Sequence, residues 1–456
     1  MMKRGVMRLP VSKVTYIFGF LLFITAVLTA CAGQGASVEP EETPIVEPVT
    51  VTPIEVAQPS PIPTIDDSNR LPQELVVWWP DTLRPGDDAQ LGDVLESQIR
   101  AFDATHDINL EFRLKRYGDV GGIMSTLRAA SGIAPGALPD VTLLRRADLL
   151  AAFEAGLIYP VDAQISESTL NGLYIPALTL GQIEDRLFGL PYMVDVLMVV
   201  HEGGGSISSE NDGANDNFWS FEDILNEDIN WVFPGRRVNG INNTLLIQYI
   251  DAGGTIPLTE DVMRLNQGAL ETVLSFYEMA VSEGLVDPQV LDFTTPVDYQ
   301  SDLFDEANDA AVVTSTHFLS EYTSDLMLGA ASIPTDSGRP ASIINGWIWV
   351  ITTDNVERQV LAAEFINWMM DVERQVQFAE AVSMLPSQRV ALQQYTIDSD
   401  ILSLMDALIE GAMPPLADSF DNIVARIIQS AFASVVSGER TAEEAVQQAV
   451  DQLTRG

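Results

Sequence analysis

The sequence predicts an α/β fold built from mainly parallel strands that are flanked by helices. The first observation is an alternation of patterns, with strands expected at 75–79, 108–114 and 140–144 and helices at 89–102 and 124–130. The second is that the strand at 75–79 is apolar at every position, which is typical of a buried strand. Successive strand–helix–strand units of this kind form a parallel sheet covered by helices.

The N-terminal elements follow from the spacing of their apolar residues. Leu91, Leu95, Ile99 and Phe102 recur at helical spacing, whereas every second residue from 108 to 114 is apolar. The first pattern predicts a helix with one buried face, and the second predicts a half-buried strand. A further helix is expected at 148–155, where Gly156 can end it.

The second half of the chain continues the alternation with more helix. The apolar run at 189–200 is long enough for a strand that passes from one domain to another. Asp354 with Glu357, and Thr441 with Glu444, have the spacing of a capping box at the start of a helix. The other elements are expected as helices at 266–283, 354–382, 420–436 and 441–453 and as strands at 310–314 and 343–352.

The charge of the chain excludes two classes of partner. Its 456 residues include 24 lysines and arginines against 65 aspartates and glutamates, a net charge of −41. Nucleic-acid phosphates and anionic lipid headgroups repel such a protein, so neither is expected to bind its surface. Hydrophobic residues make up 46% of the chain, with seven tryptophans, which excludes a disordered acidic protein.

The first 30 residues have the pattern of a secretory signal peptide. Residues 3–13 carry four basic side chains and no acid, and an uncharged, mostly apolar run follows to Ala30. The segment Leu28-Thr29-Ala30-Cys31, with the only cysteine of the chain, resembles the lipobox of bacterial lipoprotein precursors. This resemblance implies cleavage before Cys31 and a diacylglycerol anchor on its sulfur. The alternative is an uncleaved membrane anchor, because the run is close to the shortest span.

Residues 31–70 are predicted to be a disordered tether that begins at the lipidated cysteine. Seven prolines between positions 40 and 63 alternate with Glu, Thr, Val and Ser, and the segment has no apolar period. Such a segment stays extended and solvated and acts as a semi-stiff spacer. The folded body, which begins near Leu71, is therefore expected to stand away from a membrane.

Catalytic motifs are absent from the sequence. The three histidines, His106, His201 and His317, are too far apart in sequence to form a metal or proton-transfer motif. No HExxH, GxSxG, Walker A or GxGxxG motif occurs. The loop from Glu202 to Asn217 has many oxygen ligands without EF-hand spacing, so a cation site there stays open. We expect a binding protein rather than an enzyme, with no cofactor and no catalytic or metal residue.

Several ordered segments resemble one family, the extracellular solute-binding proteins of bacterial ABC importers (the maltose-binding-like family 1). The resemblance runs from about residue 71 to residue 453, after the lipobox. The segments are residues 75–79, Pro139-Asp140-Val141, residues 149–158, Leu187-Phe188-Gly189-Leu190-Pro191-Tyr192, Phe218-Trp219-Ser220-Phe221-Glu222-Asp223, Leu361-Ala362-Ala363-Glu364-Phe365, Leu385-Pro386-Ser387, and Ser437-Gly438 with Glu443-Glu444-Ala445.

The family resemblance implies a type II periplasmic-binding-protein-like fold with two lobes, each a mainly parallel sheet flanked by helices. Three crossings would join the lobes, and the ligand would bind in the cleft between them, with hinge closure around it. Lobe one is expected over residues 71–193 and 337–385, and lobe two over 197–332 and 390–456. The crossings are expected at 193–196, 333–336 and 385–388.

The resemblance also implies ligand contacts at strand ends that face the cleft. Trp78, Trp79 and Asp81 lie where the family's first strand opens into the cleft. An indole can stack on a sugar ring and a carboxylate can accept its hydroxyl hydrogen bonds, although strand alternation makes one of the two tryptophans a core residue. Arg145 and Arg146 follow the 140–144 strand, where the family often places contacts, and a surface pair is the alternative.

Two further candidate groups belong to the expected first crossing and to lobe two. Tyr192 and Asp195 flank the crossing. Ser315, Thr316 and His317 end a strand of lobe two, where the family often has a Gly-Trp element. The aromatic residue is missing here, which leaves the ligand open.

The last candidates lie on the strand that returns to lobe one. Gly346, Trp347 and Trp349 match a glycine-rich element of the family at this position. Trp347 is the strongest single candidate, because the neighbouring Gly346 lets the backbone approach a ligand closely. Trp349 lies on the same strand face, so one of the two indoles can be a core residue.

The function that these features predict is carbohydrate capture for import. The chain would be a monomeric extracytoplasmic lipoprotein, tied to the cell membrane through Cys31, that binds a sugar or oligosaccharide and delivers it to ABC permease subunits. The alternatives are a polyamine or peptide ligand on the same scaffold, or an extracytoplasmic sensor or carbohydrate-active enzyme. The sequence names neither the ligand nor the permease.

Overall fold

The computed structural model of the chain describes residues 74–84, 89–106, 108–118, 120–202, 217–237, 240–256, 264–299, 309–321, 328–416 and 422–455. The chain divides into two units, 1–65 and 66–456, and the described residues all belong to the second. The predicted signal peptide, Cys31, the tether and most of the 202–217 loop lie outside the described residues. No helix within the described ranges is long and apolar enough to cross a membrane.

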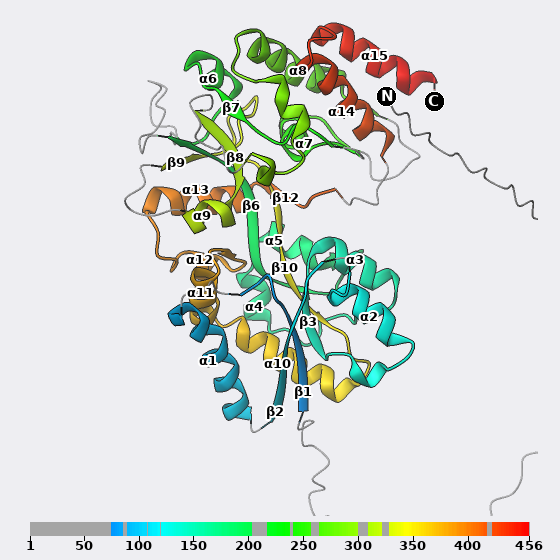
Figure 1. Cartoon of the computed structure of the whole chain (residues 1–456), viewed down its shortest axis with the longest axis vertical. Coiled ribbons are helices and arrows are strands. Elements are labelled where there is room, and N and C mark those ends of the chain that lie inside the picture. The colour runs from blue at the N-terminus through cyan, green and yellow to red at the C-terminus, as the bar shows by residue number, and fades with distance from the viewer. Residues whose placement is uncertain are drawn as a thin grey trace, which may run out of the picture. The chain divides into compact units, whose positions relative to one another are not determined.

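The first group of strands contains the parallel strands that the sequence predicted. Strand β1 lies between β2 and β3 and runs parallel to both, with Val77 opposite Val141. Strand β10 then pairs antiparallel with β3, and β6 pairs antiparallel with β10. The bounds are β1 (Glu74–Pro80), β2 (Asn109–Lys115), β3 (Val141–Leu144), β6 (Leu190–Glu202) and β10 (Ser342–Ile351) (Figure 1).

Strand β6 belongs to two groups of strands, as its length suggested. Its first half, up to Val196, pairs with β10 and with β11 (Leu385–Pro386). Its second half, from Leu197, pairs antiparallel with β8 (Ala310–Thr314) and β9 (Leu328–Ala331). Strand β7 (Trp231–Val232) extends the second group, parallel to β8. The change of partners falls between Val196 and Leu197, directly after Asp195.

Helices cover both groups of strands. Around the first group, α1 packs on α10 and α11, α10 packs on β1, and α3 and α5 pack on β10. Around the second group, α8, α14 and α15 pack on one another (Figure 1). The bounds are α1 (Ala89–His106), α3 (Arg146–Glu154), α5 (Ile175–Gly181), α8 (Gln267–Ser282), α10 (Val356–Met369), α11 (Val372–Ala381), α14 (Ile423–Val436) and α15 (Ala442–Arg455).

The remaining elements are short. They are the helices α2 (Ile123–Ser131), α4 (Glu167–Gly172), α6 (Phe221–Asn226), α7 (Asn243–Asp251), α9 (Ser315–Glu321), α12 (Arg389–Leu392) and α13 (Ser399–Glu410), the strands β4 (Gln182–Ile183), β5 (Arg186–Leu187) and β12 (Ala412–Met413), and the 3-10 helices Pro135–Ala137, Pro288–Asp292 and Pro296–Asp298.

Helix boundaries show where local sequence was and was not sufficient. The predicted box at Thr441 is confirmed, because the Glu444 amide donates to Thr441 Oγ1 and the Thr441 amide donates to Glu444 Oε2. The predicted box at Asp354 is wrong: the next residue, Asn355, caps α10 by accepting from the Arg358 amide. The single helix expected at 354–382 is two helices, because the chain turns at Met370 and Asp371 caps α11.

Candidate functional site

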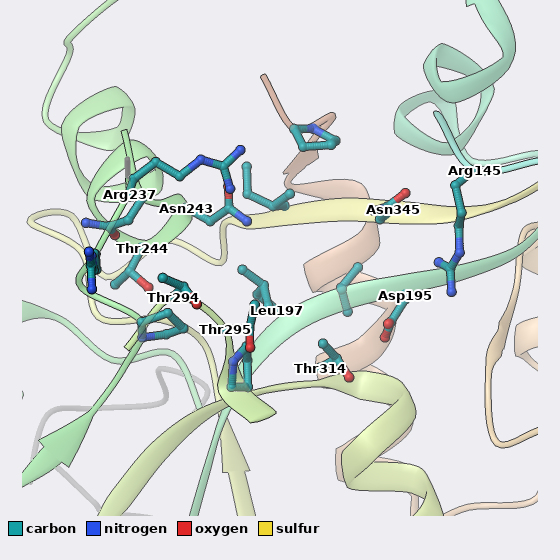
Figure 2. Close-up of a pocket in the computed structure, with 17 residues that line it drawn as sticks. Arg145, Asp195, Leu197, Arg237, Asn243, Thr244, Thr294, Thr295, Thr314 and Asn345 are labelled. Atoms are coloured by element: carbon teal, nitrogen blue, oxygen red, sulfur yellow. The ribbon is translucent and has the colours of Figure 1, made fainter. Parts of the chain in front are cut away.

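A polar pocket lies where β6 passes from the first group of strands to the second. It has a volume of about 220 Å³. In Figure 2, Arg237, Asn243, Thr244, Thr294 and Thr295 gather at one end, and Arg145, Asp195 and Asn345 gather at the other. We call these the α7 end and the β6 end. The other lining residues are Val196, Leu197, Pro234, Arg236, Asn242, Pro296, Thr314, Ile343 and Pro415.

At the β6 end, Asp195 is held by the start of α9. Ser315 Oγ donates to Asp195 Oδ1 at 2.8 Å, and the Thr316 amide donates to the same oxygen at 2.9 Å. The Val196 amide in turn donates to Ser315 Oγ at 3.1 Å. Asn345 lies opposite Asp195 in the β10–β6 register. The start of α9 therefore fixes one carboxylate at the pocket wall, beside Asn345 of β10.

Arg145 brings a positive charge to the same end. Its guanidinium lies 4.3 Å from the centroid of the Trp347 ring, and the Tyr117 ring meets Trp347 edge-on at 4.7 Å. Burial lowers the pKa of Arg145, and the charge of Asp195 opposes this effect. The Tyr117 hydroxyl donates to Asp148, and burial is the main cause of its raised pKa. The β6 end thus contains one cation, Arg145, and one anion, Asp195.

At the α7 end, a hydrogen-bond network fixes the loop that carries Arg236 and Arg237. Asn242 caps α7, since its Oδ1 accepts from the Leu245 amide at 2.9 Å. The Asn242 and Gln429 side-chain amides both donate to the Gly235 carbonyl, at 3.1 and 2.8 Å. The Arg236 amide donates to the Phe293 carbonyl at 2.9 Å. The loop is therefore tied to α7, α14 and the 290–293 turn.

Thr294 and Thr295 reach the pocket from a turn that Asp298 organises. The Asp298 carboxylate accepts from the amides of Thr294 and Thr295, at 2.6 and 2.9 Å, and from the Thr294 hydroxyl. The hydrogen bonds from these amides hold the pKa of Asp298 below its usual value. An ionised side chain at the protein surface thus fixes two threonines at the pocket rim.

Comparison with known proteins places this arrangement within a known fold. No family model and no curated protein matches the sequence. Solved structures do match: a cyclic α-maltosyl-1,6-maltose binding protein from Arthrobacter globiformis has a TM-score of 0.62 at 14% identity, over 84% of this chain and 100% of that one. The chain has the fold of the two-lobed ABC solute-binding proteins. The predicted α/β class and the resemblance are confirmed at the level of fold.

Two further solved structures share this solute-binding-protein fold. An extracellular solute-binding protein family 1 from Alicyclobacillus acidocaldarius has a TM-score of 0.59 at 16% identity, over 84% of this chain and 98% of that one. A maltose-binding periplasmic protein from Listeria monocytogenes, solved with maltose, has a TM-score of 0.59 at 14% identity, over 83% and 96%. All three neighbours are described as binding proteins rather than enzymes.

Within this solute-binding-protein fold, five of the predicted ligand contacts meet at the β6 end of the pocket. Arg145 and Asp195 line it. Trp347 lies against Arg145, while Ser315 and Thr316 hold Asp195. These three residues therefore touch the lining residues and are not themselves part of the wall.

Four predicted aromatic contacts lie in the core instead. Trp79, Tyr192 and Trp349 are fully buried and pack on one another with ring centroids 5.3–6.4 Å apart. Trp78, on the other face of β1, is 2% exposed and lies 4.3 Å below the ammonium of Lys115. The expectation that one of the two neighbouring tryptophans faces a cleft is not met here, because packed side chains cover both strand faces.

The remaining predicted residues do not line the pocket and have structural partners. Asp81 Oδ1 accepts from the Tyr117 amide at 3.0 Å. Arg146 donates to the carbonyls of Leu180 and Gln182, at 2.8 and 2.6 Å. The His317 amide donates to Thr314 Oγ1. A Cβ on Gly346 would lie 2.3 Å from the Met193 carbonyl, so this glycine permits close pairing of β10 with β6.

Sequence reasoning missed the α7 end entirely. The signal was present, because Arg236 and Arg237 are a second pair of adjacent arginines in a chain with few bases. They follow a short apolar strand, as Arg145 and Arg146 do. Asn242 was also visible as a candidate helix cap ahead of the apolar residues at 245–247.

Proposed function

We propose that the protein is an extracytoplasmic receptor of an ABC importer that captures a sugar or oligosaccharide. The observation that supports this most directly is the pocket at the change of partners of β6, lined by hydrogen-bonding side chains from both groups of strands. A ligand held there would touch both groups at once. Sugars suit such a site, because their hydroxyls pair with carboxylate, amide and guanidinium groups.

Two lobes would close around the ligand by a hinge motion. The two lobes would comprise residues 71–193 with 337–385 and residues 197–332 with 390–456. Ligand bridging Arg145 of lobe one and the α7 end of lobe two would favour the closed arrangement, because it contacts both sides only when they are close. Neighbours of the same fold that are named for maltose and related oligosaccharides support this ligand class.

The proposal also includes anchoring and delivery. Processing at Cys31 would tie the protein to the outer face of the cell membrane, the 31–70 tether would give it reach, and permease subunits would take the ligand from the closed form. We propose that the protein acts as a monomer without turnover of its ligand. A polyamine ligand fits the pocket poorly, since three arginines face a single carboxylate in its described lining.

A thermal-shift screen of the mature chain, residues 31–456, against a panel of neutral and acidic carbohydrates tests this proposal. A bound sugar is expected to raise the melting temperature in proportion to the logarithm of its concentration above the dissociation constant. The sugar recovered after incubation with the protein is expected to be chemically unchanged. A shift with spermidine or a peptide and none with any carbohydrate would contradict the proposal, as would hydrolysis of the bound sugar.

A further inference from the structure

The charge of the pocket is opposite to that of the protein. Arg145, Arg236 and Arg237 line it, and Asp195 is the one carboxylate among the described lining residues. Asp195 already accepts two hydrogen bonds from α9 on one of its oxygens. In a chain of net charge −41 with 24 bases, the described lining residues therefore include more arginines than carboxylates.

Two of the three lining arginines, Arg236 and Arg237, come from the loop at the α7 end. Arg236 makes no ion pair with any residue that the structure describes. Arg236 and Arg237 also border an adjoining hollow of about 300 Å³ that Arg426 lines as well. Arg236 is exposed, so its guanidinium is accessible to an anionic group of a ligand in the pocket.

Helix α7 adds a second set of donors to the same end. Its first turn contributes Asn243 and Thr244 to the pocket wall, and neither backbone amide has an acceptor within the described part of the chain. The positive end of a helix dipole favours an anion at this position. The loop with Arg236 and Arg237 is tied to this turn through the Gly235 carbonyl.

An unused hydroxyl points to the same conclusion. Thr244 is 1% exposed, and its buried Oγ1 has no hydrogen-bond partner. Figure 2 shows this hydroxyl on the side of the pocket that carries Thr294. Leaving a buried hydroxyl without a hydrogen bond costs free energy. The Thr244 hydroxyl is therefore expected to gain a hydrogen-bond partner when the ligand binds.

We propose that the α7 end binds the anionic group of an acidic carbohydrate, a carboxylate or a phosphate, while the β6 end binds sugar hydroxyls. Arg236 and Arg237 would supply the charged donors, and the first turn of α7 with the Thr244 hydroxyl would supply neutral ones. Guanidinium groups match the planar, two-oxygen edge of both anions. This inference rests on the proposed sugar-binding function and narrows its ligand class.

Matched ligands test the charge directly in the mature chain. Oligogalacturonates and their methyl esters have the same rings, but only the former are charged, and glucose 6-phosphate with glucose provides the phosphate pair. One acidic member is expected to bind at least tenfold more tightly than its neutral partner by calorimetry, with affinity falling as sodium chloride is raised. Which pair responds distinguishes the carboxylate from the phosphate.

Substitutions at the α7 end test whether the preference for the acidic ligand arises there. Arg236→Gln and Arg237→Gln are each expected to weaken binding of the acidic ligand by roughly 10- to 100-fold, as for lost hydrogen bonds to charged groups, and to weaken binding of the neutral partner by a smaller factor. Thr244→Val, which keeps the side-chain shape, should weaken binding of the acidic ligand by a smaller factor. Arg100→Gln removes a charge that is 70% exposed on α1 and serves as the matched control.

The outcomes separate the inference from the function on which it rests. Equal affinity for acidic and neutral partners, or an equal effect of Arg236→Gln on both, would overturn the inference while sugar binding stands. Binding of no carbohydrate of either kind would overturn the proposed function. Binding of inorganic phosphate alone, lost in Arg236→Gln, would support the anion site and reject the carbohydrate.

Discussion

The guanidinium of Arg145 lies 4.3 Å from the centroid of the Trp347 indole, and of these two residues only Arg145 lines the pocket. Trp347 is 2% exposed and also meets the edge of Tyr117. A cation over an indole face is held by the ring quadrupole, more strongly where water is excluded. Trp347 therefore acts on the pocket through Arg145, by fixing where its charge lies.

Arg145→Gln is expected to weaken ligand binding by roughly 10- to 100-fold, because a charged donor at the β6 end is lost. Isothermal calorimetry with the best ligand of the screen measures the effect. The neighbouring Arg146→Gln is the control, since Arg146 donates to carbonyls of 180–182 instead of lining the pocket. Tighter binding by Arg145→Gln would show instead that the guanidinium shields the indole from the ligand.

Trp347→Ala is expected to lower the free energy of unfolding by about 3–5 kcal/mol, because it removes a large buried side chain. The burial of the indole, which is 2% exposed, makes a loss of stability the expected result. Urea unfolding measures it. Trp347→Phe keeps an aromatic face under Arg145 and should recover much of the loss; equal stability of all three proteins would place the indole outside the core.

The sequence predicted the fold well where local patterns determine structure. Strands β1, β3 and β6 are mostly apolar runs, and such runs form buried strands in many contexts. The division of the 354–382 segment was missed, because the apolar stripe continues through the turn at Met370 and only the N-cap of Asp371 marks it. Cap residues are common outside helix ends, so a single aspartate is a weak signal.

The site was predicted less completely, because the exposure of each candidate side chain depends on residues that are distant in the sequence. Trp79 is buried by Tyr192, Trp349 and Phe378, which are 113 to 299 positions away, and no local pattern contains this information. Strand alternation placed Trp78 and Trp79 on opposite faces but could not show that both faces are covered. Arg145 was predicted because it follows the end of a strand, and Asp195 was predicted because it lies at the expected crossing.

Ser315→Ala is expected to destabilise the protein by about 1–3 kcal/mol, because the Val196 amide would be left buried without an acceptor. The variant should also weaken the ligand, since Asp195 would keep only the Thr316 amide as a fixed partner. Thermal unfolding and calorimetry measure the two effects. Ser320→Ala in the same helix is the control: its exposed hydroxyl donates to the His317 carbonyl, and both quantities should stay near those of the parent.

Asp298→Ala is expected to weaken ligand binding without opening the core, because Thr294 and Thr295 lose the carboxylate that orders their turn.

The lowered pKa of Asp298 determines how its contribution to stability depends on pH. A carboxyl whose pKa is lower in the folded than in the unfolded state stabilises the folded protein. This stabilisation is complete at pH values above the unfolded-state pKa of about 3.9, and it is lost as the pH falls through the folded-state pKa. The difference in unfolding free energy between the parent and Asp298→Ala should therefore be constant from pH 7 to pH 5 and shrink below about pH 4. Asp398→Ala, which removes an exposed cap from α13, should lower stability without changing affinity. Unchanged affinity in Asp298→Ala would remove the 294–295 turn from the binding site.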